Sequence, residues 1–235
     1  MMIHLKNLSK KYQGTTVLEI PQLEIQKGSC FGLIGNNGAG KTTLFSLLLD
    51  LIQPSSGSVT NKGIHVAQSE AWKNHTTAYI DESFLIGYLT AEEYFDFVAS
   101  LRELSKQELA ESLEAFQAFF NDEVLQQKKY LRDLSKGNQK KVGIIASLLG
   151  EPELVILDEP FANLDPSSQI QLKRIIQEQA QKQGKTFLIS SHDLSHVTEI
   201  CDRIVLLEKG CPIQDIQTSP STLKALERYF GGSLY

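Results

Sequence analysis

The sequence predicts an α/β protein with a mainly parallel sheet, an antiparallel β portion at its N-terminus and an inserted helical subdomain. Short apolar runs of the kind found in buried parallel strands alternate with helical patterns, and a glycine-rich loop joins one such run to a helix. No strand pattern interrupts residues 90–150. We therefore expect one domain over residues 1–235, with a core of residues 1–82 and 151–220, a helical subdomain of 83–150 and a short tail of 221–235.

Length and composition limit the classes of protein that need to be considered. The chain has 235 residues and a net charge of −5, which suits one large globular domain and disfavours a dedicated nucleic-acid binder. Cys30, Cys201 and Cys211 lack metal-site spacing, and their odd number argues against a disulfide framework. No signal peptide pattern and no apolar run of about 20 residues is present. Any action at a membrane is thus expected to require a partner.

The N-terminal part predicts three strands, over residues 3–8, 16–20 and 30–34. The third strand runs directly into glycines. A Leu-rich segment over residues 43–51 predicts a helix, which Pro54 and the turn residues after it should stop. Together they give the first half of the core.

The middle of the chain predicts helices. Thr90 with Glu93, and Ser105 with Glu108, have the spacing of capping boxes, in which the two side chains satisfy free amides of the first helical turn. After the second box, apolar residues recur every three or four positions and give one apolar face: Leu109, Leu113, Phe116 and Phe120. This pattern predicts the helical insertion.

Strand patterns return over residues 154–157, 186–190 and 204–207. A helix is predicted over residues 167–183, and Asp165-Pro166 marks its start because proline is preformed for the first helical position. We expect four apolar residues on its inner side: Ile170, Leu172, Ile175 and Ile176.

The glycine-rich loop fits the phosphate-binding pattern G-x-x-x-x-G-K-[ST] at every position. Backbone amides of such a loop wrap a triphosphate, and the helix after it adds its positive N-terminal dipole. Lys41 would reach the β- and γ-phosphates of ATP, while the Thr42 hydroxyl would bind Mg²⁺. The nucleotide-binding residues predicted here are Gly35, Asn36, Asn37, Gly38, Ala39, Gly40, Lys41, Thr42 and Thr43.

The strand over residues 154–157 delivers Asp158 and Glu159 at its carboxyl end, which is where α/β sheets bind ligands. Asp158 can hold Mg²⁺ through its water shell. Glu159 is placed to accept a proton from the attacking water as a general base. An apolar run followed by Asp-Glu indicates a nucleotide site only because the phosphate loop lies upstream in the same chain.

A further motif carries a resemblance to a known family. Leu134-Ser135-Lys136-Gly137-Asn138-Gln139 opens a helix predicted over residues 139–149 and resembles the signature sequence LSGGQ of ATP-binding-cassette (ABC) proteins. Lys136 and Asn138 depart from the commonest spelling. The resemblance implies a P-loop NTPase core, and it implies that Ser135 and Gly137 contact the γ-phosphate of an ATP molecule held by a second subunit.

The resemblance extends to other positions. Residues 162–165 resemble the D-loop, and His192 resembles the switch histidine that orients the attacking water. Tyr12 matches the aromatic residue that stacks on adenine. The family normally places a glutamine that bonds to Mg²⁺ before the helical subdomain. Asp81 holds that place here by its spacing to Leu89-Thr90, and Gln68, which comes earlier than that spacing allows, is a second candidate.

Taken together, the resemblance implies an ATP-hydrolysing subunit with Glu159, His192 and Lys41 as catalytic residues, and ATP and Mg²⁺ as cofactors. The implied partners are a second ATPase subunit, giving a homodimer when ATP is bound, and a separate integral membrane permease on whose cytoplasmic face the subunit lies. The signature spelling is similar to ATPases of export-type systems, and the short tail after Gln217 favours export. The alternative is a soluble ABC-type ATPase that acts on a cytosolic assembly partner, while a binding module without hydrolysis is disfavoured because Glu159 and His192 are both present.

Overall fold

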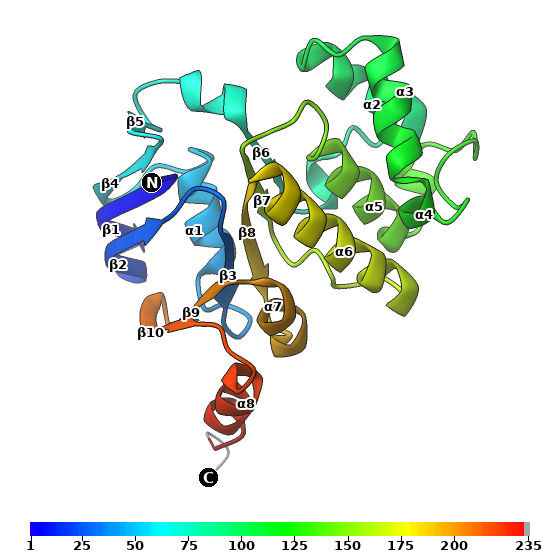
Figure 1. Ribbon diagram of the computed structural model, residues 1–235. Helices are drawn as coiled ribbons and strands as arrows, with labels where there is room; N and C mark the ends of the chain where they lie inside the picture. Colours follow the sequence, from blue (N-terminus) through cyan, green and yellow to red (C-terminus); the bar gives the residue numbers. More distant parts are fainter. Residues whose placement is uncertain (233–235) are drawn as a thin grey trace.

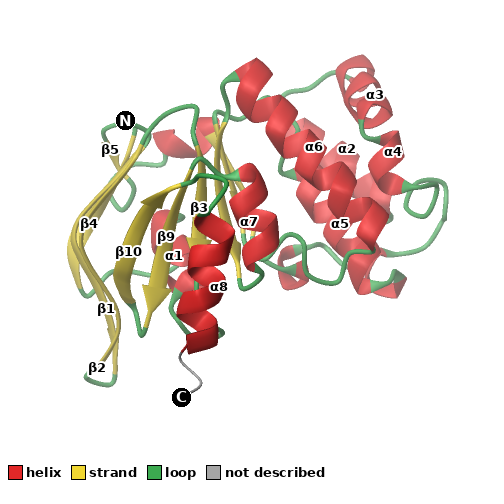
Figure 2. Ribbon diagram, turned by 60° about the horizontal axis from the view of Figure 1, so that its bottom comes forward, coloured by secondary structure: helices red, strands yellow, loops and turns green. Residues whose placement is uncertain are grey.

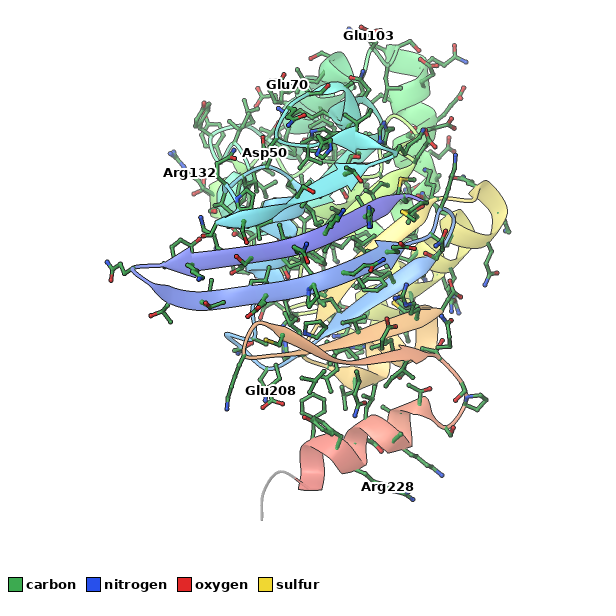
Figure 3. All side chains as sticks on the ribbon, turned by 90° about the vertical axis from the view of Figure 1, so that its left-hand side faces the viewer. Asp50, Glu70, Glu103, Arg132, Glu208 and Arg228 are labelled. Carbon is green, nitrogen blue, oxygen red and sulfur yellow. The ribbon has the colours of Figure 1, made fainter. Side chains whose placement is uncertain are left out.

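The computed structural model describes residues 1–232 and consists of two β-sheets with helices between and beside them (Figure 1). The smaller sheet is antiparallel, with strand order β2-β1-β4-β5. Its strands are β1 (Ile3–Tyr12), β2 (Thr15–Ile25), β4 (Ser56–Asn61) and β5 (Ile64–His65). β1 and β2 cross the face turned to the viewer in Figure 3.

The larger sheet has strand order β10-β9-β3-β8-β7-β6 and is parallel except where β10 pairs with β9. Four parallel pairings therefore bring the carboxyl ends of β3, β6, β7 and β8 to one edge. The strands are β3 (Cys30–Ile34), β6 (Thr76–Tyr79), β7 (Leu154–Leu157), β8 (Thr186–Ser191), β9 (Arg203–Glu208) and β10 (Cys211–Gln217).

The helices fall into four groups (Figures 1 and 2). Helix α1 (Lys41–Leu48) lies between the two sheets, and α6 (Pro166–Gln183) and α7 (Leu194–Ile200) lie on the other side of the larger sheet. The segment between β6 and β7 is helical, and α8 (Thr222–Gly232) follows β10. The helices between β6 and β7 are α2 (Ala91–Leu101), α3 (Lys106–Ala115), α4 (Gln117–Phe120) and α5 (Lys136–Ala146).

The larger sheet separates two apolar cores, because successive strand residues point to opposite faces. In β3, Phe31 and Leu33 pack toward α1 and the antiparallel sheet, while Cys30 and Ile34 pack toward α6, α7 and the helical segment. β7 divides in the same way. The strands that carry the site are buried on both faces, which specifies their register. A slip by one residue would move each side chain to the opposite core.

The predicted caps are confirmed. Thr90 and Ser105 both form complete capping boxes, at α2 and α3, and the carboxylate of Asp165 accepts hydrogen bonds at the start of α6. The bounds of β3 and β7 agree with the predicted strands residue for residue. The starts of these three helices and the bounds of these two strands therefore lie where the sequence predicts them.

Other expectations about the elements are wrong. Ile170 is 52% exposed, so only Leu172, Ile175 and Ile176 of the predicted inner side pack against the core. The signature helix begins at Lys136 because Ser135 caps it, earlier than the predicted Gln139, and it ends at Ala146. Within the predicted tail, residues 222–232 form α8, and residues 233–235 lie outside the described residues.

Within residues 1–232, no helix has both the length and the apolar character needed to span a membrane. Cys30 and Cys201 are buried with their Sγ atoms 3.4 Å apart, and Cys211 is exposed; all three are free thiols.

Candidate functional site

The phosphate loop lies between β3 and α1 and depends on its glycines. Gly40, which precedes α1, has φ +105°, a conformation that glycine adopts without strain. A methyl group on Gly35 would lie 2.4 Å from the Leu207 carbonyl oxygen, so no larger residue fits there. The loop is closed by a hydrogen bond from the Ala39 amide to the Asn36 carbonyl, at 3.0 Å. The sequence therefore forms a tight backbone cradle.

Lys41 turns back over this cradle. Its side chain is only 6% exposed, and its Nζ atom donates a hydrogen bond of 2.6 Å to the Gly35 carbonyl oxygen. The same atom lies 3.2 Å from Oε1 of Glu159. A buried ammonium group at the N-terminus of a helix is suited to bind phosphate oxygens.

Thr42 and Asp158 come together as the sequence predicts. The Thr42 hydroxyl donates a 2.5 Å hydrogen bond to Oδ2 of Asp158, and the Ser190 hydroxyl donates to Oδ1. Burial raises the pKa of Asp158, and the two hydroxyl hydrogen bonds act in the opposite direction. A hydroxyl beside a carboxylate is a donor set that Mg²⁺ accepts when phosphate oxygens and water complete its shell. Among residues 1–232, no group of three or more His, Cys, Asp or Glu side chains is arranged to hold a metal ion.

Glu159 has a left-handed backbone, with φ +47°, and its carboxylate faces the cradle. Oε2 accepts a 2.8 Å hydrogen bond from Nδ1 of His192, which must be the donor because a carboxylate only accepts. Oε1 is buried without a hydrogen-bond partner, and Nζ of Lys41 lies 3.2 Å from it without hydrogen-bond geometry. An acceptor oxygen held without a donor at this place fits a substrate water. The structure thus brings Lys41, Glu159 and His192 together.

The signature motif packs against the predicted D-loop. Ser135 caps α5 through a 3.2 Å hydrogen bond from the Asn138 amide to its hydroxyl. A methyl group on Gly137 would lie 2.8 Å from the Asn163 carbonyl oxygen. Lys141, only 1% exposed, lies 3.2 Å from Glu123. The contact of Ser135 and Gly137 with an ATP molecule held by a second subunit stays a prediction.

Tyr12 lies at the end of β1, where it pairs with Thr15 across the turn to β2. Its ring is 48% exposed, with Nζ of Lys10 4.8 Å from its centroid. The Val17 carbonyl in β2 would lie 3.2 Å from a methyl group on Gly40, so this β-hairpin borders the phosphate loop. An exposed ring at that border is available to stack on a base.

Asp81 follows β6 and is exposed. Because β6 pairs in parallel with β7, Asp81 comes from the same sheet edge as Asp158, whose amide donates to the Tyr79 carbonyl. The Asp81 carboxylate accepts a 2.6 Å hydrogen bond from the Ser83 amide and so caps a short 3₁₀ turn over residues 82–84. Its part in metal binding stays a prediction. Gln68, the other candidate, lies before this strand, in the connection from β5.

Sequence reasoning missed three side chains around Glu159. Ser190 accepts a 2.9 Å hydrogen bond from the Glu159 amide. Lys140, which is 5% exposed, donates a 2.8 Å hydrogen bond to the Glu159 carbonyl oxygen. Glu82 lies 4.0 Å from Nζ of Lys140. Burial lowers the pKa of Lys140, and nearby carboxylates, Glu82 first, raise it. The only signal in the sequence was the Lys140-Lys141 pair directly before the apolar half of the helix.

A separate hollow of about 520 Å³ lies between the phosphate loop and α8. Its lining includes Asn36–Ala39 of the loop and Tyr229 and Phe230 of α8, but not Lys41, Asp158 or Glu159. Tyr229 donates a 2.8 Å hydrogen bond to Glu208, whose position beside α8 is marked in Figure 3. This hollow is therefore distinct from the cluster of polar residues at the carboxyl ends of the strands.

This cradle, with an acidic pair at the end of β7 and a histidine after β8, defines the class of nucleotide-binding P-loop proteins. Comparison with known proteins gives the family. The family model described as ABC transporter matches residues 18–162. The chain belongs to the ABC transporter ATP-binding proteins, and its enzyme class is that of an ATPase.

Individual relatives agree with this result. The chain is 33% identical to the ABC transporter ATP-binding protein YhaQ of Bacillus subtilis, over 98% of this chain and 74% of YhaQ. It is 32% identical to the bacitracin transport ATP-binding protein BcrA of Enterococcus faecalis, over 93% of this chain and 70% of BcrA. A solved structure of an ATP binding subunit of an ABC transporter is similar with a TM-score of 0.84 and 30% identity, over 98% of this chain and 94% of that one. A 38% identical ABC transporter ATP-binding protein of Synechocystis is matched over 80% of this chain, which spans only 53% of that relative.

Proposed function

We propose that this chain is the ATP-hydrolysing subunit of an ABC transporter, which dimerises around two ATP molecules and drives a separate membrane permease. The observation that carries the proposal is the position of Glu159, whose carboxylate is held between Lys41 and His192 at the end of the strand that also delivers Asp158. The cradle binds the triphosphate, and the acidic pair lies where its terminal phosphate would be. The arrangement supports hydrolysis more than binding alone.

The roles follow from the geometry. Lys41 neutralises charge on the phosphates, and the loop amides orient them, because phosphoryl transfer depends on positioning and electrostatic stabilisation. Glu159 takes the proton of the attacking water on Oε1, which has no hydrogen-bond partner, and His192 holds Oε2 in place. Thr42 and Asp158 would hold Mg²⁺, which would supply positive charge between the phosphate oxygens.

The second half of each site would come from a second copy of the chain. Ser135 and Gly137 lie at the N-terminus of α5, where free amides and the helix dipole favour an anion. Their contact would be with the ATP that the cradle of the other copy holds. In a dimer with two composite sites, ATP binding closes the pair, and hydrolysis removes the contacts that keep it closed.

The surface after β6 supports a docked permease. Phe84 and Tyr88, four residues apart in the segment after β6, are 58% and 68% exposed. Exposed apolar side chains that lie together mark interaction surfaces. Phe84 lines a hollow of about 200 Å³ together with Leu51, Ile80 and Tyr94. An apolar hollow of this size accepts a short helix or loop of a partner. The hollow also includes Asp81, next to the nucleotide site.

Export is the direction we propose. The signature spelling Leu134–Gln139 supports it, as does the similarity to BcrA, a bacitracin transport protein by its name. The transported substrate would be selected by the permease. ATP and Mg²⁺ are the cofactors, and the subunit would lie on the cytoplasmic face of the membrane through its partner.

The test is recovery of the partner. Tagged Glu159→Gln protein with ATP and Mg²⁺ should recover a multi-span membrane protein from detergent-solubilised membranes. A Phe84→Ala/Tyr88→Ala variant should lose it, while Ile213→Ser, at a 41% exposed residue on β10, should not. Recovery of soluble proteins alone, with no membrane protein, would replace the permease proposal with the assembly-ATPase alternative.

A separate prediction concerns Asp81. Asp81→Asn keeps an oxygen that can cap the Ser83 amide but removes the charge. If Asp81 helps to bind Mg²⁺, the Asp81→Asn variant should need about tenfold more Mg²⁺ for half-maximal turnover. Loss of a residue that holds a metal ligand in place has an effect of this size on metal affinity. Turnover is measured as phosphate release over a Mg²⁺ titration, with Glu70→Gln as the control at an exposed carboxylate. Unchanged Mg²⁺ dependence and turnover in Asp81→Ala would rule out this role.

A further inference from the structure

The backbone of Glu159 is held from both sides in a conformation that side-chain-bearing residues rarely adopt. Its φ of +47° lies in the left-handed region. Its amide donates 2.9 Å to Ser190 Oγ, from β8, and its carbonyl accepts 2.8 Å from Lys140 Nζ, from α5. A conformation of this kind persists when the surroundings over-determine it. These two bonds hold the backbone from which the Glu159 carboxylate extends toward His192 and Lys41.

The burial of Lys140 at this position is energetically unfavourable. It is 5% exposed, and a buried ammonium group loses much hydration free energy unless it is paired. Its hydrogen-bond acceptor is a neutral carbonyl, and the carboxylate nearest to it is Glu82, at 4.0 Å. The nearby ring of Tyr79, with its centroid 5.8 Å from Nζ, adds a weaker attraction. A neutral donor would satisfy the carbonyl, so the buried charge needs another reason.

Glu82 supplies that reason. Its Oε1 accepts a 3.0 Å hydrogen bond from the Tyr79 hydroxyl, which fixes the carboxylate over Lys140. Glu82 also begins the 3₁₀ turn that ends at the exposed Phe84. The charge of Lys140 is therefore balanced by a residue of the turn where a partner would dock. A shift of this turn changes the position of Glu82, and with it the hold of Lys140 on Glu159.

We propose that Lys140 is a positioning residue: it fixes the peptide of Glu159 for proton abstraction, and it takes its own position from Glu82 on the turn after β6. The inference rests on the proposed role of Glu159 in hydrolysis. It adds a path between the docking surface and that residue that passes through one buried cation. Neither Lys140 nor Glu82 contacts the substrate.

The test separates turnover from binding. Lys140→Met should lower kcat about tenfold or more while the KM for ATP and the affinity for a fluorescent ATP analogue change less than about twofold. Lys140→Arg, which keeps the charge and the donor, should restore most of kcat. Glu82→Gln keeps an acceptor for Tyr79 and should lower kcat less than Lys140→Met does. Lys185→Met is the matched control, because Lys185 is 6% exposed and bonds a neutral glutamine away from the site.

A combined variant tests the route of the effect. If Lys140 acts through Glu159, adding Lys140→Met to Glu159→Gln should not lower the residual rate further. An additive loss, or equal losses of kcat and ATP affinity, would overturn the proposal. Should Lys140→Met melt far below the parent, Glu82→Gln decides: an unchanged kcat in that variant would equally overturn it. Loss of turnover in Glu159→Gln with full turnover in Lys140→Met would leave the proposed function intact and refute only the positioning role.

Discussion

Glu159→Gln should abolish ATP turnover, with a loss of at least about 100-fold, while ATP binding survives. Glutamine has the same shape, so the hydrogen bond with His192 and the contact with Lys41 can persist with little change. Its amide does not accept a proton from water at neutral pH. The variant should therefore bind ATP, close with a second copy and remain closed.

Three measurements check this result: phosphate release, equilibrium binding of a fluorescent ATP analogue, and size-exclusion chromatography with ATP and Mg²⁺. Glu153→Gln is the matched control. Glu153 precedes the other end of β7, where it pairs with Lys27 and Lys62 at 2.6 Å each, and its loss should leave turnover unchanged. Turnover at the parent rate in Glu159→Gln would disprove the general-base role.

Lys41→Met should weaken ATP binding itself, by about 100-fold or more. Two charge-assisted hydrogen bonds to phosphate oxygens contribute about 1.5–3 kcal/mol each, and about 1.4 kcal/mol corresponds to tenfold in affinity. Methionine keeps the length of the side chain but leaves Oε1 of Glu159 without its neighbouring cation. Turnover should fall with affinity, unlike in Glu159→Gln.

Titration with the fluorescent ATP analogue measures the change directly, and thermal melting without nucleotide checks that the variant folds. Lys185→Met serves again as the control for loss of a buried cation. An affinity within about threefold of the parent would mean that the loop amides alone hold the phosphates, and Lys41 would lose its assigned role.

The core of the fold could be predicted because its strands are buried on both faces. The apolar runs that became β3 and β7 have no other stable environment, so their bounds were correct. β6 was missed because Thr76 and Thr77 break its apolar pattern, although both are buried and Thr77 donates 2.6 Å to the Ser147 carbonyl. Helix α7, with only seven residues, carried too short a pattern to be seen.

The site was predictable where its residues are close in sequence or share a sheet edge. Lys41, Thr42, Asp158 and His192 meet because parallel strands end together. The bond of Lys140 to Glu159 could not be read from the chain, since it depends on how α5 packs against the turn after β7. Ile170 was misplaced for a similar reason: its side of α6 faces solvent, which the spacing alone does not tell.

The lack of a side chain at Gly137 matters for the stability of the fold as well as for the shape of the signature motif. Alanine there would meet the Asn163 carbonyl at 2.8 Å, and Asn163 lies two residues before the cap of α6. A larger residue at this position would therefore push against the backbone just before α6, which is 18 residues long. Substitutions at this glycine should therefore lower the stability of the fold, so that a loss of turnover in such a variant would not by itself report on the chemistry of the signature motif.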